Sequence, residues 1–380
     1  MPPSLSSQTP IGTAPTGPAI ALTSPLDYQV FQRSATLKGK IEISGHADLP
    51  PGRQALRIEA RLSGASLSGP LPDHWTHLHI DRASGNFSGV LHTIPGGFYQ
   101  LQVRLIGDQS AVAEATVPHV GLGEVFVVSG QSNSTNYGEV RQQTQTGMVV
   151  NFTGDTWRLA DDPELGVQDH STKGSFMPSF GDDLYRKYHV PIAVAPVGHG
   201  STSVRQWLPK DDPVDVMPTM TRFVIRNAQG ELVSDGTLFD GMMQRIHQLG
   251  KHGFRALLWH QGESDAHQAP EHSISADQYR AMMIELIRAA HKSAGWNFPW
   301  FVAEATYNTP SKTVDPALEE AQRSLWVSHT ALQGPDTDTL GSQYRQNQGA
   351  GVHFSNAGLK AHGALWAHAV EHYLDTVLHR

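Results

Sequence analysis

Residues 121–134 read GLGEVFVVSGQSNS, and this stretch decides the fold of the second half of the chain. Its apolar run, Glu124–Val128 (EVFVV), shows no alternation of apolar and polar residues, which is typical of a parallel strand buried on both faces. A tight turn with Gly130 follows and leads to Ser132. Open α/β sheets place their sites at the carboxyl ends of strands, so we expect an exposed, reactive Ser132 at that edge.

Further along the chain, sequence patterns typical of strands alternate with patterns typical of helices. The clearest helix pattern is 276–294, where Ser275 and Gln278 form a capping box and Gly295 ends the helix. A last helix is expected over 356–378. The alternation predicts an α/β fold whose parallel sheet is covered by helices on both faces. The other apolar runs of the strand type are Ile192–Val197, Phe254–Trp259 and Phe298–Ala303.

The first third of the chain has a different periodicity. In Ala55–Leu62 and Phe98–Ile106, apolar residues alternate with polar ones, which indicates strands with one buried face. We therefore predict a small antiparallel β-sandwich, Ig-like or related, over residues 24–120 and an α/β domain over residues 121–380. Residues 1–23 are rich in Pro, Ser and Thr and are expected to form a flexible arm.

The composition excludes several classes of function. The chain has 380 residues and a net charge of −8, which argues against a nucleic-acid partner and against anionic membrane surfaces. No apolar run is long enough for membrane insertion. Because there is no cysteine, disulfides, thiolate metal sites and a cysteine nucleophile are excluded. The N-terminus lacks the features of a signal peptide, so the compartment stays open: secreted or periplasmic if a signal was removed, cytoplasmic otherwise.

Three more polar segments lie where such a sheet places catalytic groups. In the first of them, residues 197–203, a glycine-rich turn leaves backbone N–H groups free to face an oxyanion. Glu263 and Asp265 either pair as acid and base or hold a histidine. His353, just before the last helix, is a candidate base for Ser132. Each segment also has a plain structural explanation: a polar turn, a solvated loop or a buried structural histidine. The segments are 197–203 (VGHGSTS), 259–265 (WHQGESD) and 351–358 (GVHFSNAG).

Taken together, these motifs resemble the SGNH-hydrolase superfamily, in particular the sialate O-acetylesterase-like and acetylxylan-esterase-like carbohydrate esterases. The resemblance rests on GQSN at 130–133, WHQGESD at 259–265 and HFSNAGL at 353–359, and it runs from about Glu124 to the end. It implies an SGNH-type α/β/α sandwich with a parallel sheet, preceded by a β-sandwich. It also implies a serine esterase that removes O-acetyl groups from an acetylated saccharide through an acyl-enzyme, with no cofactor.

The resemblance assigns roles to individual residues. Ser132 matches the nucleophile and His353 the general base. The oxyanion would be bound by the backbone N–H groups of Ser132 and Gly200 and by the side chain of Gln261. The candidate substrate contacts are Asn133, Tyr137 and Trp207. Core packing is the alternative role for Trp207.

One position departs from the pattern of the resembling family. Its usual DxxH places an aspartate three residues before the histidine, but here that position is Ala350. Glu263 is our preferred partner for the His353 imidazole. The alternatives are Asp336 or Asp338, a Ser-His dyad oriented by a backbone carbonyl, and an impaired enzyme. Losing the acid of a triad costs about 10⁴ in turnover, so an active enzyme needs a substitute.

Other functions are weighed against the esterase. A carbohydrate-binding protein with a decayed site is favoured by Ala350 alone. A short-chain esterase with non-sugar substrates would need an apolar pocket, for which the sequence gives no sign. Metal catalysis is not expected, because the histidines near the motifs lack the HxxxH or HExxH spacing of a zinc enzyme. These histidines are His199, His260 and His267. The sequence leaves the oligomeric state open.

Overall fold

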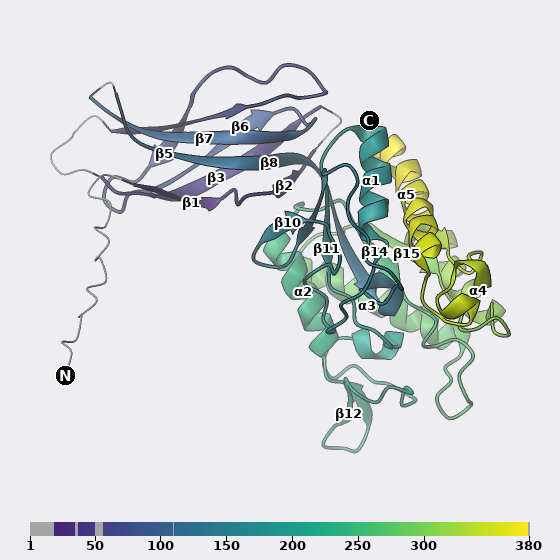
Figure 1. Ribbon diagram of the computed structural model, residues 1–380. Helices are drawn as coiled ribbons and strands as arrows, with labels where there is room; N and C mark the ends of the chain where they lie inside the picture. Colours follow the sequence, from purple (N-terminus) through teal and green to yellow (C-terminus); the bar gives the residue numbers. More distant parts are fainter. Residues whose placement is uncertain (1–18, 35–36, 50–55, 109, 379–380) are drawn as a thin grey trace, which may run out of the picture.

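The structure is a computed structural model that describes residues 19–34, 37–49, 56–108 and 110–378. The chain is a mixed α/β protein, as predicted. Figure 1 shows a β-sandwich on one side and a larger part, with helices around a sheet, on the other. Most of the predicted N-terminal arm, residues 1–18, lies outside the described residues. Residues 20–23, also assigned to the arm, instead belong to a strand that pairs with its neighbour through Ala21 and His46.

The sandwich is built from strands that pair mainly antiparallel. The alternation predicted for 98–106 is confirmed, since Tyr99, Leu101, Val103 and Leu105 are all buried. Only β2 runs parallel to its neighbour β8 among the described pairs of this part. The strands are β1 (Ile20–Ser24), β2 (Gln29–Gln32), β3 (Gly39–Ala47), β4 (Arg57–Ser63), β5 (Thr76–Ile80), β6 (Asn86–Thr93), β7 (Phe98–Gly107) and the first half of β8 (Ser110–Gly130).

Strand β8 continues without a break from the sandwich into the second part. Its residues up to Gly121 pair with β7, and its residues from Glu124 onward pair with strands of the other sheet. The predicted boundary at 120/121 therefore falls inside one strand. Buried Glu124 marks the junction, where it accepts hydrogen bonds of 2.7 Å from both Arg33 and Arg255.

The second part contains a sheet in which β8 lies near the middle. The strand order is β10-β9-β11-β8-β14-β15-β16, and all these pairs are parallel except β10 with β9. A short antiparallel pair, β12 (Val224–Arg226) and β13 (Leu232–Ser234), stands apart from this sheet. The remaining strands are β9 (Val149–Phe152), β10 (Trp157–Leu159), β11 (Ile192–Pro196), β14 (Ala256–His260), β15 (Trp300–Glu304) and β16 (Leu332–Asp336).

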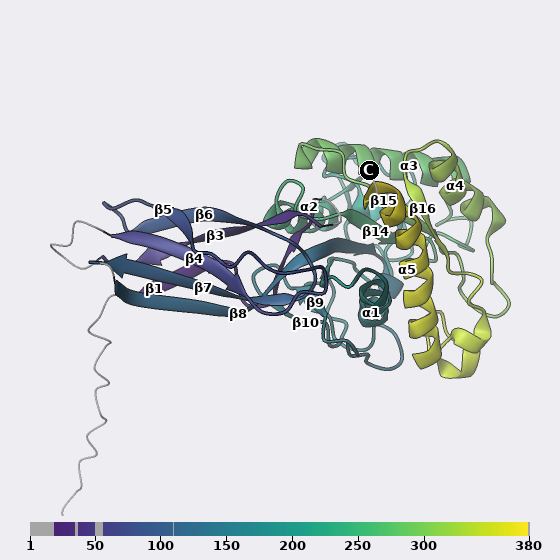
Figure 2. The ribbon, with the colours of Figure 1, turned by 90° about the horizontal axis from the view of Figure 1, so that it is seen from above.

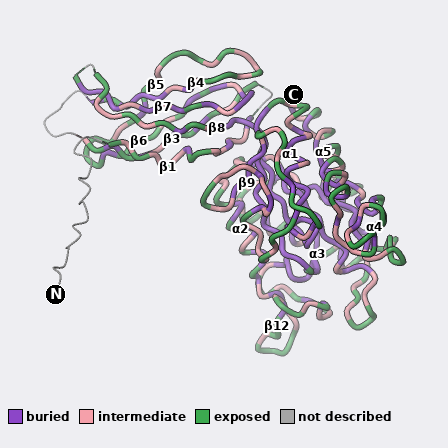
Figure 3. Tube along the Cα trace, in the orientation of Figure 1, coloured by how far each residue is buried: buried purple, intermediate pink, exposed green. Residues whose placement is uncertain are grey.

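Helices cover both faces of this sheet, because alternate strand residues point to opposite sides. Val125 and Val127 join the core under α2, α3 and α4, whereas Phe126 and Val128 join the core under α1 and α5. Figure 3 shows the buried residues concentrated between these layers. No described helix is both long and apolar enough to cross a membrane. The helices are α1 (Met177–Tyr188), α2 (Thr237–Leu249), α3 (Ala276–Ala294), α4 (Pro316–Val327) and α5 (Asn356–Leu378).

The predicted ends of α3 and α5 are confirmed. The Ser275 side chain accepts a hydrogen bond from the backbone N–H of Gln278, and Gly295 ends α3 in the left-handed conformation. The N-terminus of α5 follows directly on the His353 segment. This sheet and its helices place the carboxyl ends of β8, β11 and β14 together at one edge.

Candidate active site

Ser132 lies in a single 3-10 turn, η1 (Ser132–Ser134), immediately after β8. Gly130 before it has φ of +124°, and a Cβ there would collide with the carbonyl oxygen of His260, so only glycine fits. Ser132 is 4% exposed and is thus buried, not exposed as expected; the amide of its neighbour Asn133 lies against the Val352 carbonyl. Within the described residues its hydroxyl makes no hydrogen bond.

His353 is held at the same edge by the segment that precedes α5. Its carbonyl accepts a 2.8 Å hydrogen bond from the backbone N–H of Gln346. Its ring lies against Tyr137, with centroids 5.0 Å apart and planes tilted by 30°. The Asn133 amide, next to Ser132 in the chain, lies 3.4 Å from the Val352 carbonyl. The structure therefore brings the serine turn, Tyr137 and the His353 segment together.

The imidazole of His353 is neutral at physiological pH. Burial lowers its pKa from 6.5 to about 4, the charge of Glu263 opposes this shift, and the charges of Lys173 and Arg345 add to it. Its Nδ1 lies 2.9 Å from Nε2 of Gln346. This partner was missed at the sequence level, since nothing in the motif marks a glutamine seven residues ahead of the histidine.

Glu263 has other partners than the expected His353. Its Oε1 accepts a 2.7 Å hydrogen bond from Asn133 and lies 2.9 Å from Nε2 of His260. Its other oxygen is buried and makes no hydrogen bond within the described residues. Burial alone would raise the Glu263 pKa, but the charge and hydrogen bond of His260, with the hydrogen bond from Asn133, bring it below its usual value. The carboxylate thus acts on His353 only through its field.

The two aspartates weighed as alternatives are also engaged elsewhere. Asp338 accepts hydrogen bonds of 2.7 and 2.9 Å from the backbone N–H groups of Thr306 and Tyr307. Asp336 accepts from the backbone N–H of Asp338, at 3.0 Å. Neither carboxylate has a hydrogen bond to His353 in the part of the chain that the structure describes. Both order the loops after β15 and β16.

Behind Glu263, a buried chain of side chains runs toward α5. His260 Nδ1 lies 3.1 Å from His362 Nε2, which also accepts a 3.0 Å hydrogen bond from Trp366. Since the indole can only donate, His362 Nε2 is an acceptor and His260 carries the shared hydrogen. Burial, with the charge of His260, keeps the His362 pKa well below its usual value. His260 Nδ1 thus donates to His362, while its Nε2 faces the Glu263 carboxylate at 2.9 Å.

Two of the expected oxyanion donors have acceptors already. The backbone N–H of Gly200 donates to Asp169 Oδ2 at 2.6 Å. The Gln261 amide is fully buried and donates to Asp265 at 2.7 Å and to the Thr202 carbonyl at 3.1 Å. These bonds occupy the two amide hydrogens of Gln261: one stays within the loop after β14, and the other ties that loop to the turn after β11.

The expected sugar contacts differ in exposure. Trp207 is fully buried, donates a 2.9 Å hydrogen bond to Thr202 and packs edge-to-face on Trp259, so it is a core residue and not a stacking platform. A capping box of Ser203 and Gln206 begins its short helix η2 (Val204–Trp207). Asn133 is buried on Glu263, whereas Tyr137 is partly exposed beside His353.

Comparison with known proteins connects this geometry to a family. A family model described as carbohydrate esterase, sialic acid-specific acetylesterase, matches residues 122–372. The chain belongs to this family. This carbohydrate acetylesterase is accordingly a carboxylic ester hydrolase that removes O-acetyl groups from carbohydrate. A search among curated proteins gave no match.

Several solved structures are similar to this acetylesterase. A carbohydrate acetylesterase from Xanthomonas citri is 18% identical, with 94% of this chain and 76% of that chain covered and a TM-score of 0.52, which shows a shared fold. A protein from Arabidopsis thaliana is 16% identical over 66% of this chain and 98% of that chain, with a TM-score of 0.46. A family 2 carbohydrate esterase with a carbohydrate-binding domain, from Corynascus thermopiles, is 12% identical. The match covers 95% of this chain and 100% of that chain, with a TM-score of 0.36.

Proposed function

We propose that this acetylesterase works through a Ser132 nucleophile and a His353 base, on an SGNH-type α/β/α sandwich that spans residues 121–380 and follows a β-sandwich over residues 24–120. The observation that carries the proposal is a neutral imidazole held beside the serine turn, at the carboxyl edge of parallel strands. General base catalysis needs the unprotonated ring, and burial supplies it. The family match covers both residues.

The proposed reaction has two steps. Ser132 Oγ attacks the acetyl carbonyl carbon while Nε2 of His353 takes the hydroxyl proton. The bond to the sugar oxygen then breaks, and that oxygen receives the proton from His353. Water, deprotonated by the same imidazole, then attacks the acetyl carbonyl carbon of the acyl-enzyme. The bond to Ser132 Oγ breaks, His353 gives its proton to that oxygen, and acetate leaves.

The negative charge on the carbonyl oxygen needs donors that have no other acceptor. Ser132 and Asn133 begin the turn η1, so their backbone N–H groups have no partner inside it and are our proposed donors. Gly200 joins them only if the Asp169 carboxylate moves off its N–H group. Tyr137, half-buried beside His353, stays our proposed contact for the sugar ring.

Gln346 replaces the missing aspartate in this proposal. A half-turn of its amide brings Oε1, in place of Nε2, to within hydrogen-bond distance of Nδ1 of His353. The imidazole then carries its hydrogen at Nδ1, and Nε2 is free to take the Ser132 proton. A neutral amide orients the ring without raising its basicity, in agreement with the low pKa of His353.

We expect Gln346→Ala to lower kcat about 10- to 100-fold with little change in KM, because the ring loses its orientation and not its substrate. Gln346→Glu should shift the acid limb of the pH–rate profile to higher pH, since a carboxylate favours the imidazolium. Glu263→Gln should change kcat much less than Gln346→Ala while lowering the melting temperature. Steady-state kinetics from about pH 3.5 to about pH 8, a range that includes the His353 pKa of about 4, and thermal unfolding measure these effects.

Gln343→Ala is the matched control, because Gln343 is an exposed glutamine of the same loop. It should leave both kcat and the pH profile unchanged. If Glu263→Gln removes activity from a stably folded protein while Gln346→Ala is silent, Glu263 orients His353 and our assignment of Gln346 is wrong.

The esterase proposal itself is tested by acetate release. The wild-type chain should hydrolyse p-nitrophenyl acetate and a panel of acetylated sugars, and should hydrolyse p-nitrophenyl butyrate more slowly. A preference for the longer acyl chain would favour a general short-chain esterase. No acetate release from any ester, together with retained saccharide binding, would favour a carbohydrate-binding protein.

A further inference from the structure

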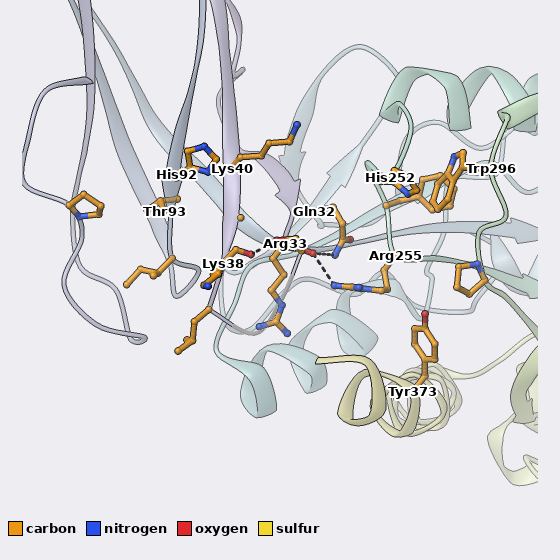
Figure 4. A pocket seen from close by; sticks show the side chains of 17 residues that line it. Gln32, Arg33, Lys38, Lys40, His92, Thr93, His252, Arg255, Trp296 and Tyr373 are labelled. Carbon is orange, nitrogen blue, oxygen red and sulfur yellow. Dashed lines mark hydrogen bonds between the residues drawn. The ribbon is translucent and has the colours of Figure 1, made fainter. Parts of the chain in front are cut away.

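A cavity of about 840 Å³ lies between the sandwich and the esterase part, far from Ser132. Figure 4 shows Lys38, Lys40 and Thr93 on the side of the sandwich and Arg255 and Trp296 on the side of the esterase part. This volume is typical of sites for small ligands, which often lie at domain interfaces. The active site lies at the carboxyl end of β8: the seven residues from Glu124, behind the wall of this cavity, to Gly130 span about 20 Å of strand.

The lining of the cavity is basic in an acidic protein. The described lining residues include four cations, Arg33, Lys38, Lys40 and Arg255, and no aspartate or glutamate, whereas the chain as a whole has a net charge of −8. Two carboxylates outside the lining neutralise part of this charge: Glu124 pairs with Arg33 and Arg255, and Glu42 pairs with Lys40 at 2.6 Å. The exposed Lys38 has no ion-pair partner among the described residues. The cavity therefore favours an anionic ligand.

The same cavity offers an aromatic surface and an unused hydroxyl. The Trp296 ring is partly exposed and is held by His252, with centroids 4.5 Å apart, and by Phe254, at 5.2 Å. A ring fixed in this way presents a flat apolar face to the ligand. Thr93 is 7% exposed, lines the cavity, and its hydroxyl has no hydrogen bond within the described residues. A buried polar group without a partner points to a polar ligand or water.

We propose that this cavity is a second, non-catalytic binding site for a carboxylate-bearing saccharide, such as a uronate-containing chain. Its carboxylate lies against Lys38 and Lys40, its ring stacks on Trp296, and a hydroxyl pairs with Thr93. A site at the opposite end of the sheet from Ser132 holds a polymer on the enzyme without occupying the catalytic edge. The proposal does not depend on the esterase mechanism.

Binding is measured by calorimetry with the full chain and polygalacturonate, which carries no acetyl group. The neutral comparison is the same polymer with its carboxyl groups reduced to alcohols. Polyglutamate tests whether charge alone is recognised. We expect binding of polygalacturonate only, and we expect it to weaken as salt rises, because exposed charges are screened. Equal binding of the reduced polymer, or of polyglutamate, would overturn the proposal.

Two variants and one control locate the site. The double variant Lys38→Ala/Lys40→Ala should weaken binding of polygalacturonate about tenfold, because two exposed charge contacts are lost. Trp296→Ala, made separately, should weaken binding by a similar factor because the stacking surface is lost. Lys292→Ala is the control, since Lys292 is an exposed lysine near Trp296 that does not line the cavity. Hydrolysis of p-nitrophenyl acetate should stay at wild-type level in all three, which also reports folding. Wild-type binding by both cavity variants would place the ligand elsewhere.

Discussion

Ser132→Ala is expected to lower kcat for acetyl ester hydrolysis by about 10⁴-fold or more, because the acyl-enzyme cannot form without the hydroxyl. KM should change little, since the hydroxyl has no hydrogen bond within the described residues and its removal leaves the turn η1 intact. Acetate release from p-nitrophenyl acetate measures the loss. Mass spectrometry after reaction with a serine-directed phosphonate should show one adduct on the wild type and none on the variant.

The matched control is Ser134→Ala, two residues along the same turn. The Ser134 hydroxyl donates a 2.7 Å hydrogen bond to the Gln131 carbonyl, so its loss weakens the turn without touching the chemistry. We expect activity within about fivefold of wild type, in line with about 1 kcal/mol for a lost hydrogen bond. The nucleophile is misassigned if Ser134→Ala is the inactive variant and Ser132→Ala turns over normally.

The second large effect is expected from His353→Ala, which should reduce kcat nearly as much as Ser132→Ala. Because the two residues act as one unit, the double variant should be hardly slower than either single variant. Additive losses would show that His353 acts independently of Ser132. His372→Ala, at an exposed position of α5, is the control and should be silent.

The pH dependence follows from the neutral state of His353. Only the unprotonated imidazole accepts the Ser132 proton, so kcat/KM should fall as pH drops through the His353 pKa of about 4 and stay level through neutral pH. Lys173→Ala should move this limb to higher pH, because the lysine charge lowers the pKa. An acid limb near 6.5 in the wild type would mean that burial does not act on His353 as described.

Much of the fold could be predicted because it depends on local patterns. The run Glu124–Val128 reports burial on both faces, and it is indeed the buried second half of β8. The capping box at Ser275 and Gln278 fixed the start of α3 through contacts three residues apart. Such signals lie within a few residues of the structure they specify, so one sequence suffices to find them.

Several contacts of the site could not be predicted, because they join loops that are distant in sequence. The partner of Gly200 is a carboxylate 31 residues earlier, and the partner of Glu263 is an amide 130 residues earlier. Nothing in the local pattern distinguishes a glutamate that faces His353 from one that pairs with His260. The motifs therefore gave the identity of the polar residues at the sheet edge but not their pairing.

The unbroken strand β8 has a consequence for motion between the two parts of the molecule. A flexible linker would let the sandwich rotate freely, but here one strand is bonded to β7 before the junction and to β11 and β14 after it. Relative movement is then limited to the bending of a hydrogen-bonded ladder and is further resisted by the buried charges around Glu124. The sandwich is thus a rigid extension of the enzyme, and its surface keeps a fixed orientation relative to the carboxyl ends of the parallel strands.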